Sequence, residues 1–143
     1  MATTTATINI SSDIISGAPI NISKTMTMNK LQSSIGLEET SGLRSKKFTD
    51  TAAVSIIEQD EYTNTKASKV YIRNTGSSSS DFFYVAKNAS AAAGDTAAVT
   101  IGRLYGGNWM LIPYLADVNI TVAPSTADTM TLEYMVFAEG MTK

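Results

Sequence analysis

Apolar and polar residues alternate along short stretches of this chain, and the alternation is clearest in its last third. The stretches 98–101, 108–114, 117–122 and 129–137 each switch between apolar and polar side chains and end at Gly, Pro, Asn, Asp or Ser. Successive side chains of a β-strand point to opposite faces of a sheet. This period of two therefore predicts four half-buried strands.

Similar runs precede this block. Residues 7–11 and 19–28 alternate on either side of a turn at 16–19, and residues 51–57 form a further run. Residues 67–87 predict a hairpin, because Asn74, Gly76 and four serines stand between two apolar runs. No helical period is sustained and no internal repeat is visible. We expect an all-β fold, an antiparallel sandwich or barrel of about eight to ten short strands.

Two segments depart from this pattern. Residues 1–12 are expected to form an N-terminal arm, in which the strand at 7–11 adds to the sheet edge of a neighbouring chain. Residues 29–47 are expected to form a long loop, since Gly36 and the serine pairs interrupt any period. Loops of this length are often functional. The 143 residues suit a single domain over 1–143.

Composition removes several classes of function. The chain has no Cys and no His, so a disulfide, a thiolate zinc site and a histidine-based catalytic triad are excluded. The formal net charge of −2 argues against a nucleic-acid partner, and no stretch of about 18 apolar residues predicts a membrane span. The first residues lack a basic start and an apolar core, so we expect no signal peptide and synthesis in the cytoplasm.

The remaining candidates for site chemistry are weak. Glu58, Asp60, Glu61 and Asn64 could surround a calcium ion, but their spacing lacks the glycine of an EF-hand loop. The glycines of 102–107 precede a strand and not a helix, so they favour a turn with positive φ over a phosphate site. We therefore expect no enzyme activity, no metal, no cofactor and no small-molecule substrate.

Aromatic residues leave one alternative open. Tyr105 and Trp109 flank the Gly106-Gly107 turn, and exposed rings of this kind would suit a carbohydrate-binding β-sandwich. Burial of Trp109 as a core anchor, together with Leu111 and Pro113, is favoured over that interpretation.

A small sandwich without catalytic groups suits a structural part that works through buried contact area. Its candidate partner interface combines the arm, the basic residues of the loop and two methionines expected to face outward. These residues are Thr7, Ile8, Asn9, Ile10, Arg44, Lys46, Lys47, Met110 and Met135.

Three segments carry a family resemblance. They are a Val-Tyr-Ile-Arg-Asn-Thr strand at 70–75, a Gly-Arg-Leu-Tyr-Gly-Gly-Asn-Trp-Met-Leu-Ile-Pro step at 102–113, and a closing Leu-Glu-Tyr-Met-Val-Phe strand at 132–137. Over residues 68–139 the chain resembles small virion structural proteins of tailed bacteriophages. The first 66 residues lie outside the resemblance.

The resemblance implies a jelly-roll-like β-sandwich located on the virion. The expected function is that of a capsid decoration or cement protein, which binds the outer capsid surface and stabilises the head. The implied partners are the major capsid protein and copies of the chain itself, as a homotrimer. A neck or tail component of the virion is the alternative within the same group.

Overall fold

The structure, a computed structural model, describes residues 3–12, 20–29, 35–59, 61–62, 68–87 and 100–141. Within them the chain forms strands and no helix, so none of the described residues belongs to a helix that could cross a membrane. All strand pairs are antiparallel, and the predicted all-β sandwich is confirmed. The strands are β1 (Thr3–Ser12), β2 (Ile20–Asn29), β3 (Ile35–Thr40), β4 (Arg44–Phe48), β5 (Val54–Ile57), β6 (Ser68–Asn74), β7 (Phe82–Lys87), β8 (Thr100–Tyr105), β9 (Trp109–Tyr114), β10 (Ile120–Pro124) and β11 (Met130–Met141).

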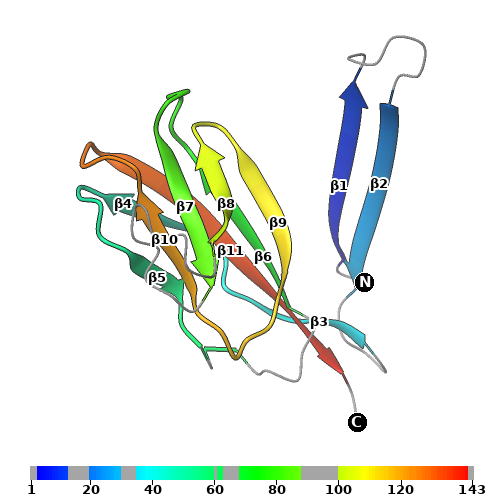
Figure 1. The fold of residues 1–143 in the computed structure, drawn as a ribbon. Coiled ribbons are helices and arrows are strands. Elements are labelled where there is room, and N and C mark those ends of the chain that lie inside the picture. Colours follow the sequence, from blue (N-terminus) through cyan, green and yellow to red (C-terminus); the bar gives the residue numbers. More distant parts are fainter. Residues whose placement is uncertain are drawn as a thin grey trace.

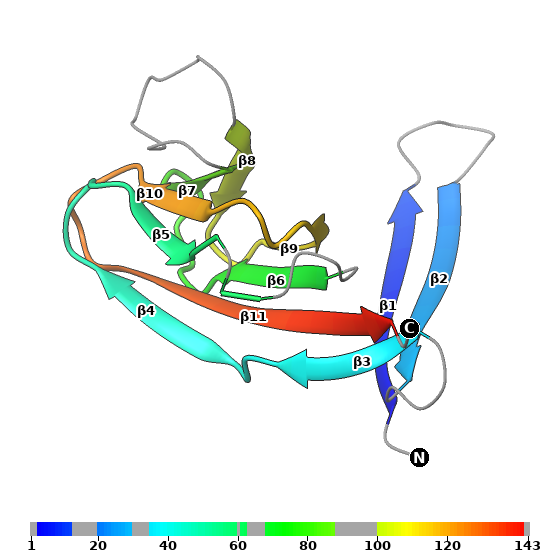
Figure 2. The same ribbon diagram turned by 90° about the horizontal axis from the view of Figure 1, so that it is seen from below.

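Strands β4 to β11 form a jelly roll. One sheet has the order β5-β10-β7-β8, and in the other β11 lies between β6-β9 on one side and β3 and β4 on the other. The pairs β7–β8, β6–β9, β5–β10 and β4–β11 enclose one another along the sequence. This is the pairing of one long hairpin rolled into two sheets, and it is visible as the two layers of Figures 1 and 2.

The core lies between these two layers. Val70 and Ile72 of β6 and Leu132 of β11 face Phe83 and Val85 of β7, and all five are fully buried. The ring of Phe48 packs edge to face against the ring of Phe83, with 5.2 Å between the two ring centroids. Each large apolar side chain buried in this way contributes about 1.5–3 kcal/mol to folding.

The predicted hairpin at 67–87 is wrong, because β6 and β7 belong to different sheets. The segment between them carries the chain from one layer to the other. Asn74, at the end of β6, stabilises this crossing with a buried side chain: its Nδ2 donates to the carbonyl of Leu104 in β8 and its Oδ1 accepts from the N–H of Gly76, each at 3.0 Å.

The turn between β8 and β9 lies against the same crossing. Gly107 has a φ of 79°, which confirms the predicted positive φ in this turn. Gly106 is required for a different reason: a Cβ there would stand 2.5 Å from the backbone oxygen of Ser78. The N–H of Gly106 donates to that same oxygen at 3.1 Å, so the two backbones touch.

The predicted loop at 29–47 is also wrong over most of its length, where the chain forms β3 and β4. Both strands pair with β11. Three residues separate Thr40 from Arg44, whereas two residues separate their partners Phe137 and Tyr134 on β11. The segment that joins β3 to β4 therefore has one extra residue, as in a β-bulge. Residues 30–34 lie outside the described residues.

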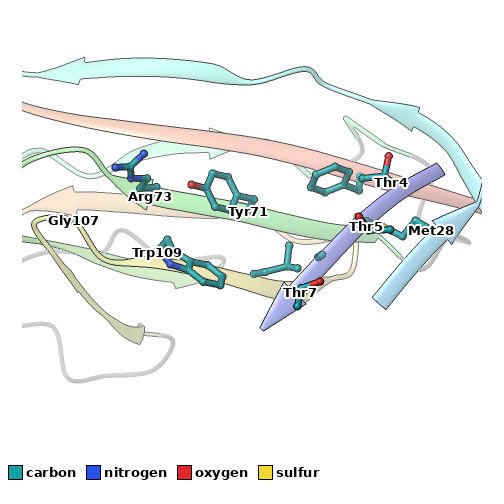
Figure 3. A pocket seen from close by; sticks show the side chains of 11 residues that line it. Thr4, Thr5, Thr7, Met28, Tyr71, Arg73, Gly107 and Trp109 are labelled. Atoms are coloured by element: carbon teal, nitrogen blue, oxygen red, sulfur yellow. The ribbon is translucent and has the colours of Figure 1, made fainter. Parts of the chain in front are cut away.

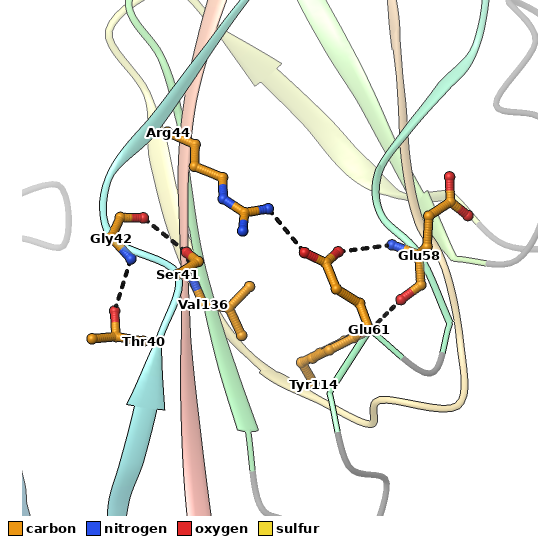
Figure 4. Close-up of polar contacts among 8 residues, drawn as sticks. All are labelled: Thr40, Ser41, Gly42, Arg44, Glu58, Glu61, Tyr114 and Val136. Carbon is orange, nitrogen blue, oxygen red and sulfur yellow. Dashed lines mark hydrogen bonds and ion pairs between the residues drawn. The ribbon is translucent and has the colours of Figure 1, made fainter.

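Ser41 holds this bulge onto β11. Its N–H donates to the carbonyl of Val136 at 3.1 Å, and its Oγ accepts from the N–H of Val136 at 2.9 Å. Gly42 follows with a φ of 68°, and its N–H donates to Thr40 Oγ1 (Figure 4). The polar sequence that resembles a loop therefore forms the edge of the sheet, where charged side chains are typical.

The N-terminal arm is a β-hairpin. β1 pairs with β2 in unbroken register from Thr3↔Asn29 to Ser12↔Ile20, and the hairpin stands beside the jelly roll (Figures 1 and 2). The strand expected at 7–11 is thus present, but it pairs within its own chain. One of its backbone edges is satisfied by β2 without a neighbouring chain.

Candidate functional site

The described residues contain no cluster of three His, Cys, Asp or Glu side chains that could hold a metal ion. The acidic segment after β5 has a structural role instead. Glu61 accepts a hydrogen bond from Arg44 Nη1 at 2.9 Å and one from the N–H of Glu58 at 3.4 Å (Figure 4). The bond with Glu61 raises the pKa of Arg44. Asp60 and Asn64 of the proposed calcium set lie outside the described residues.

The feature that points to a function is the hairpin, because its two faces differ in chemistry. Paired residues of antiparallel strands share a face. One face carries Thr5, Thr7 and Asn9 opposite Thr27, Thr25 and Ser23, and hydroxyl and amide groups bond across it, as in Thr7–Thr25 at 3.0 Å and Ser23–Asn9 at 2.6 Å. The opposite face carries, in paired order, Thr4–Met28, Ala6–Met26, Ile8–Lys24, Ile10–Ile22 and Ser12–Ile20.

This apolar face is covered at its base and open at its tip. Met28, at the base, is 2% exposed. Towards the tip the isoleucines are 39–49% exposed, and the described residues of the chain leave them uncovered. They are Ile8, Ile10, Ile20 and Ile22.

The base of the hairpin lies over the outer face of the sheet that contains β11, β6 and β9. Trp109 and Leu111 of β9 and Tyr71 of β6 face outward there, and the rings of Tyr71 and Trp109 are 6.4 Å apart. A groove of about 530 Å³ runs between this face and the hairpin (Figure 3). Its lining is largely apolar, with Arg73 on the rim, where Arg73 Nη1 lies 3.8 Å from Glu133 Oε2.

A second groove continues the first along the hairpin. It measures about 270 Å³ and is lined on the hairpin side by Ala6, Ile8 and Met26, and on the sheet side by Leu111 and Pro113. Lys24 and Lys69 complete the lining. The two grooves share Ala6 and Leu111 in their linings, so together they make a largely apolar track, with Lys24 and Lys69 beside it, from Gly107 towards the hairpin tip.

Trp109 corrects the sequence interpretation. It was expected in the core, yet it is 50% exposed on the outer face. The inward positions of β9 are Met110, Ile112 and Tyr114, which pair with the core-facing residues of β6. All six residues of β9 are apolar or aromatic, so alternation gave no indication of which face was inside.

The candidate interface residues do not form one surface. Ile8 and Ile10 lie on the apolar face of the hairpin, whereas Thr7 and Asn9 lie on the polar face. Met135 pairs with Tyr71 and shares the outer face, but Met110 packs against the core and does not face outward as expected.

The three basic residues of the predicted loop at 29–47 do not share one surface either. Arg44 binds Glu61, Lys46 lies over the ring of Phe48 at 5.8 Å, and Lys47 is exposed on the opposite side of β4. Whether these residues contact a partner stays a prediction.

Sequence reasoning missed Ile20, Ile22, Tyr71 and Trp109 as surface residues. A signal was present for the first two, because 19–28 alternates with the same parity as 7–11. Two alternating strands joined by a turn form a hairpin with one apolar face. The sheet covers the base of that face and leaves the isoleucines exposed.

Comparison with known proteins gives little guidance. No protein-family model matches the sequence, and no curated protein matches it. Among solved structures, the chain is similar to the crystal structure of Aeromonas hydrophila PliG, a periplasmic lysozyme inhibitor of g-type lysozyme. The likeness has a TM-score of 0.36 at 15% identity, over 74% of this chain and 87% of that chain.

This result contradicts the expected function. The matched structure is a lysozyme inhibitor and not a virion protein, so the role of capsid decoration or cement protein is withdrawn. At a TM-score of 0.36 the likeness carries no argument about what this chain itself binds.

Proposed function

We propose that this protein is a non-catalytic self-assembly module, in which copies of the chain associate through the tip of the β1–β2 hairpin. The observation that carries the proposal is the row of exposed isoleucines on one face of that tip. They are Ile8, Ile10, Ile20 and Ile22.

An isolated two-stranded hairpin is marginally stable in water. The base of this hairpin gains stability from the sheet beneath it, but positions 9–12 and 20–23 at the tip line neither groove, and the hairpin stands beside the jelly roll as a two-stranded ribbon (Figure 1). Single exposed apolar residues are normal on soluble proteins, whereas several gathered on one face are typical of an interaction site. A partner that covers the isoleucines would therefore remove apolar area from water and would also hold the tip in its paired form.

A second copy of the chain is the partner that composition favours. The formal charge of −2 on 143 residues produces little repulsion between copies. The polar face of the hairpin is built from Thr, Ser and Asn and stays solvated while the apolar face is covered. Most soluble oligomers are assemblies of identical chains with closed symmetry.

The test is the oligomeric state of a variant with the cross-strand pair Ile10–Ile22 replaced by Thr–Thr. Threonine keeps the β-branched shape, and the hairpin already contains a Thr7–Thr25 pair in the same strands. Losing two isoleucines from an interface at about 1.5 kcal/mol each raises the dissociation constant about 100-fold. Light scattering after size exclusion and sedimentation velocity would measure it.

The matched control changes the neighbouring cross-strand pair on the polar face, Asn9→Thr with Ser23→Thr. It alters the same strands to the same extent and should leave the association unchanged. A wild-type protein that stays monomeric at the highest concentration reached, or a Thr–Thr variant that associates as the wild type does, would refute the proposal.

A further inference from the structure

We infer that the hairpin tip of one copy docks on the outer face of the neighbouring copy's β11-β6-β9 sheet, against Trp109, Tyr71 and Leu111. This inference rests on the proposed self-assembly and adds the surface that receives the tip. The occupant of the groove is then a second copy of this chain, and each copy both offers a tip and accepts one.

The receiving face has the chemistry that the tip requires. The tip offers aliphatic side chains in an extended, paired strand ribbon. The groove offers the exposed indole of Trp109 beside Tyr71, with Leu111 and Phe137 along its length. Aliphatic and aromatic side chains that pack face to face remove apolar area from water, and aromatic residues are enriched at the centre of protein interfaces.

The contact between the base of the hairpin and its own sheet supports the match between the two surfaces. At its base the apolar face of the hairpin lies over the same face of the sheet, where Met28 is buried, and Thr5 and Thr7 of the polar face line the edge of that groove. The second groove extends this contact through Ala6 and Ile8 towards the tip. Docking of a neighbour's tip would continue an existing interface along one apolar track.

The groove of a chain cannot cover the isoleucines at the tip of that chain's own hairpin. Ten residues of strand extend about 33 Å, and the hairpin residues that line the two grooves all lie within 4–8 and 24–28, so the described positions 9–12 and 20–23 line neither groove. The rigid paired backbone of β1 and β2 prevents the tip from folding back over the base. A second molecule can bring its groove to the tip, and a head-to-tail contact of this kind generates a closed ring when the rotation between copies closes.

Electrostatics do not oppose the contact. Arg73, the cation on the rim of the groove, is near Glu133 in its own chain. The tip itself carries isoleucines and hydroxyl or amide side chains and has no charged residue among the described positions 8–12 and 20–23. Lys24, which shares the face with Ile8, and Lys69 line the second groove. Lys24 is exposed, and a lysine stem can pack on apolar surface while its ammonium group stays in water.

The chain contains a native reporter of this contact. Trp109 is its one tryptophan, and half of its surface is exposed. As the protein is concentrated from monomer to oligomer, the emission maximum of Trp109 should shift to shorter wavelength and its quenching by acrylamide should fall. The Ile10→Thr, Ile22→Thr variant should lose both changes, whereas the Asn9→Thr, Ser23→Thr control should keep them.

The absence of cysteine allows a second, independent measurement. Copies carrying Ile10→Cys are mixed with isotopically heavy copies carrying Arg73→Cys, and the disulfide dimers formed under mild oxidation are identified by mass. The mixed 10–73 dimer should exceed the level given by Ile101→Cys copies mixed with Arg73→Cys copies. Ile101 is an equally exposed isoleucine on the opposite sheet, so it gives the collision background.

The outcomes separate this inference from the proposal beneath it. Association without a change in Trp109 emission would overturn the docking surface while self-assembly stands. Dimers linked 10–10 in place of mixed ones would also overturn it and would indicate tip-to-tip contact. A chain that stays monomeric would overturn the proposed function itself. Association with the emission shift and the mixed dimer supports both.

Discussion

Replacing Asn74 with alanine should destabilise the fold more than any other single polar substitution in the described sheets. The side chain of Asn74 is 1% exposed and joins the two layers of the jelly roll. Its Nδ2 donates to the carbonyl of Leu104 and its Oδ1 accepts from the N–H of Gly76. Alanine removes both bonds and supplies no substitute.

The two lost bonds have unequal costs. Leu104 is buried, so its carbonyl would remain desolvated and unpaired, at about 1–3 kcal/mol. Gly76 is exposed, so its N–H can turn to water and costs about 1 kcal/mol. The sum is roughly 2–4 kcal/mol, a large share of the roughly 5–15 kcal/mol that holds a typical domain folded. The melting temperature should fall by roughly 6–16 °C.

Urea unfolding followed by far-UV circular dichroism measures this change. We expect a lower midpoint with an unchanged slope, because the area exposed on unfolding stays the same. Asn108→Ala is the matched control: Asn108 is exposed in the adjoining turn, and its loss should change the free energy of unfolding by less than about 0.5 kcal/mol. A loss below about 1 kcal/mol for Asn74→Ala would refute the reasoning, since the Leu104 carbonyl would then have found another donor.

Two further predictions concern the backbone and the surface. Gly106→Ala should lower the free energy of unfolding by about 2–4 kcal/mol, because its Cβ would collide with the backbone of Ser78. Gly102 has open space around it, so Gly102→Ala should change that free energy by less than about 0.5 kcal/mol. Equal losses for the two variants in chemical denaturation would contradict this. The Arg44–Glu61 ion pair is partly exposed, so a double-mutant cycle with Arg44→Ala and Glu61→Gln should give a coupling of about 0–1 kcal/mol that falls with added salt; a coupling above about 2 kcal/mol would show a pair far less hydrated than the structure indicates.

Alternation located most of the strands but could not say which of them pair. The runs at 7–11, 19–28, 108–114 and 129–137 all fall on strands. The hairpin expected at 67–87 fails because a turn such as Asn74–Gly76 can return a chain to the same sheet or carry it to the facing one. That choice is made by contacts far away in the sequence, here by Leu104.

The candidate site was harder to predict for a related physical reason. A period of two reveals that a strand has two faces, and a polar face identifies the other as the core. Where both faces are apolar, as in β9, this signal disappears. Trp109 faces outward because the hairpin provides a second apolar layer, which no local pattern in β9 records. β4 was missed for the opposite reason, since Lys46 and Lys47 at a sheet edge resemble a solvated loop.

The nested pairing of the jelly roll also orders the events of folding. The pair β7–β8 closes a connection of twelve residues, 88–99, and every later pair encloses the one before it. The entropic cost of closing the loop grows with each outer pair, so we expect strand pairing to start at β7–β8 and to proceed to β6–β9, β5–β10 and β4–β11. Folding should be slow, as in other folds dominated by contacts between residues far apart in the sequence. β4 acquires a partner only when β11 has been synthesised. On the ribosome, β6 must therefore wait for β9 and β5 for β10, and Phe48 of β4 has no strand partner until β11 has emerged.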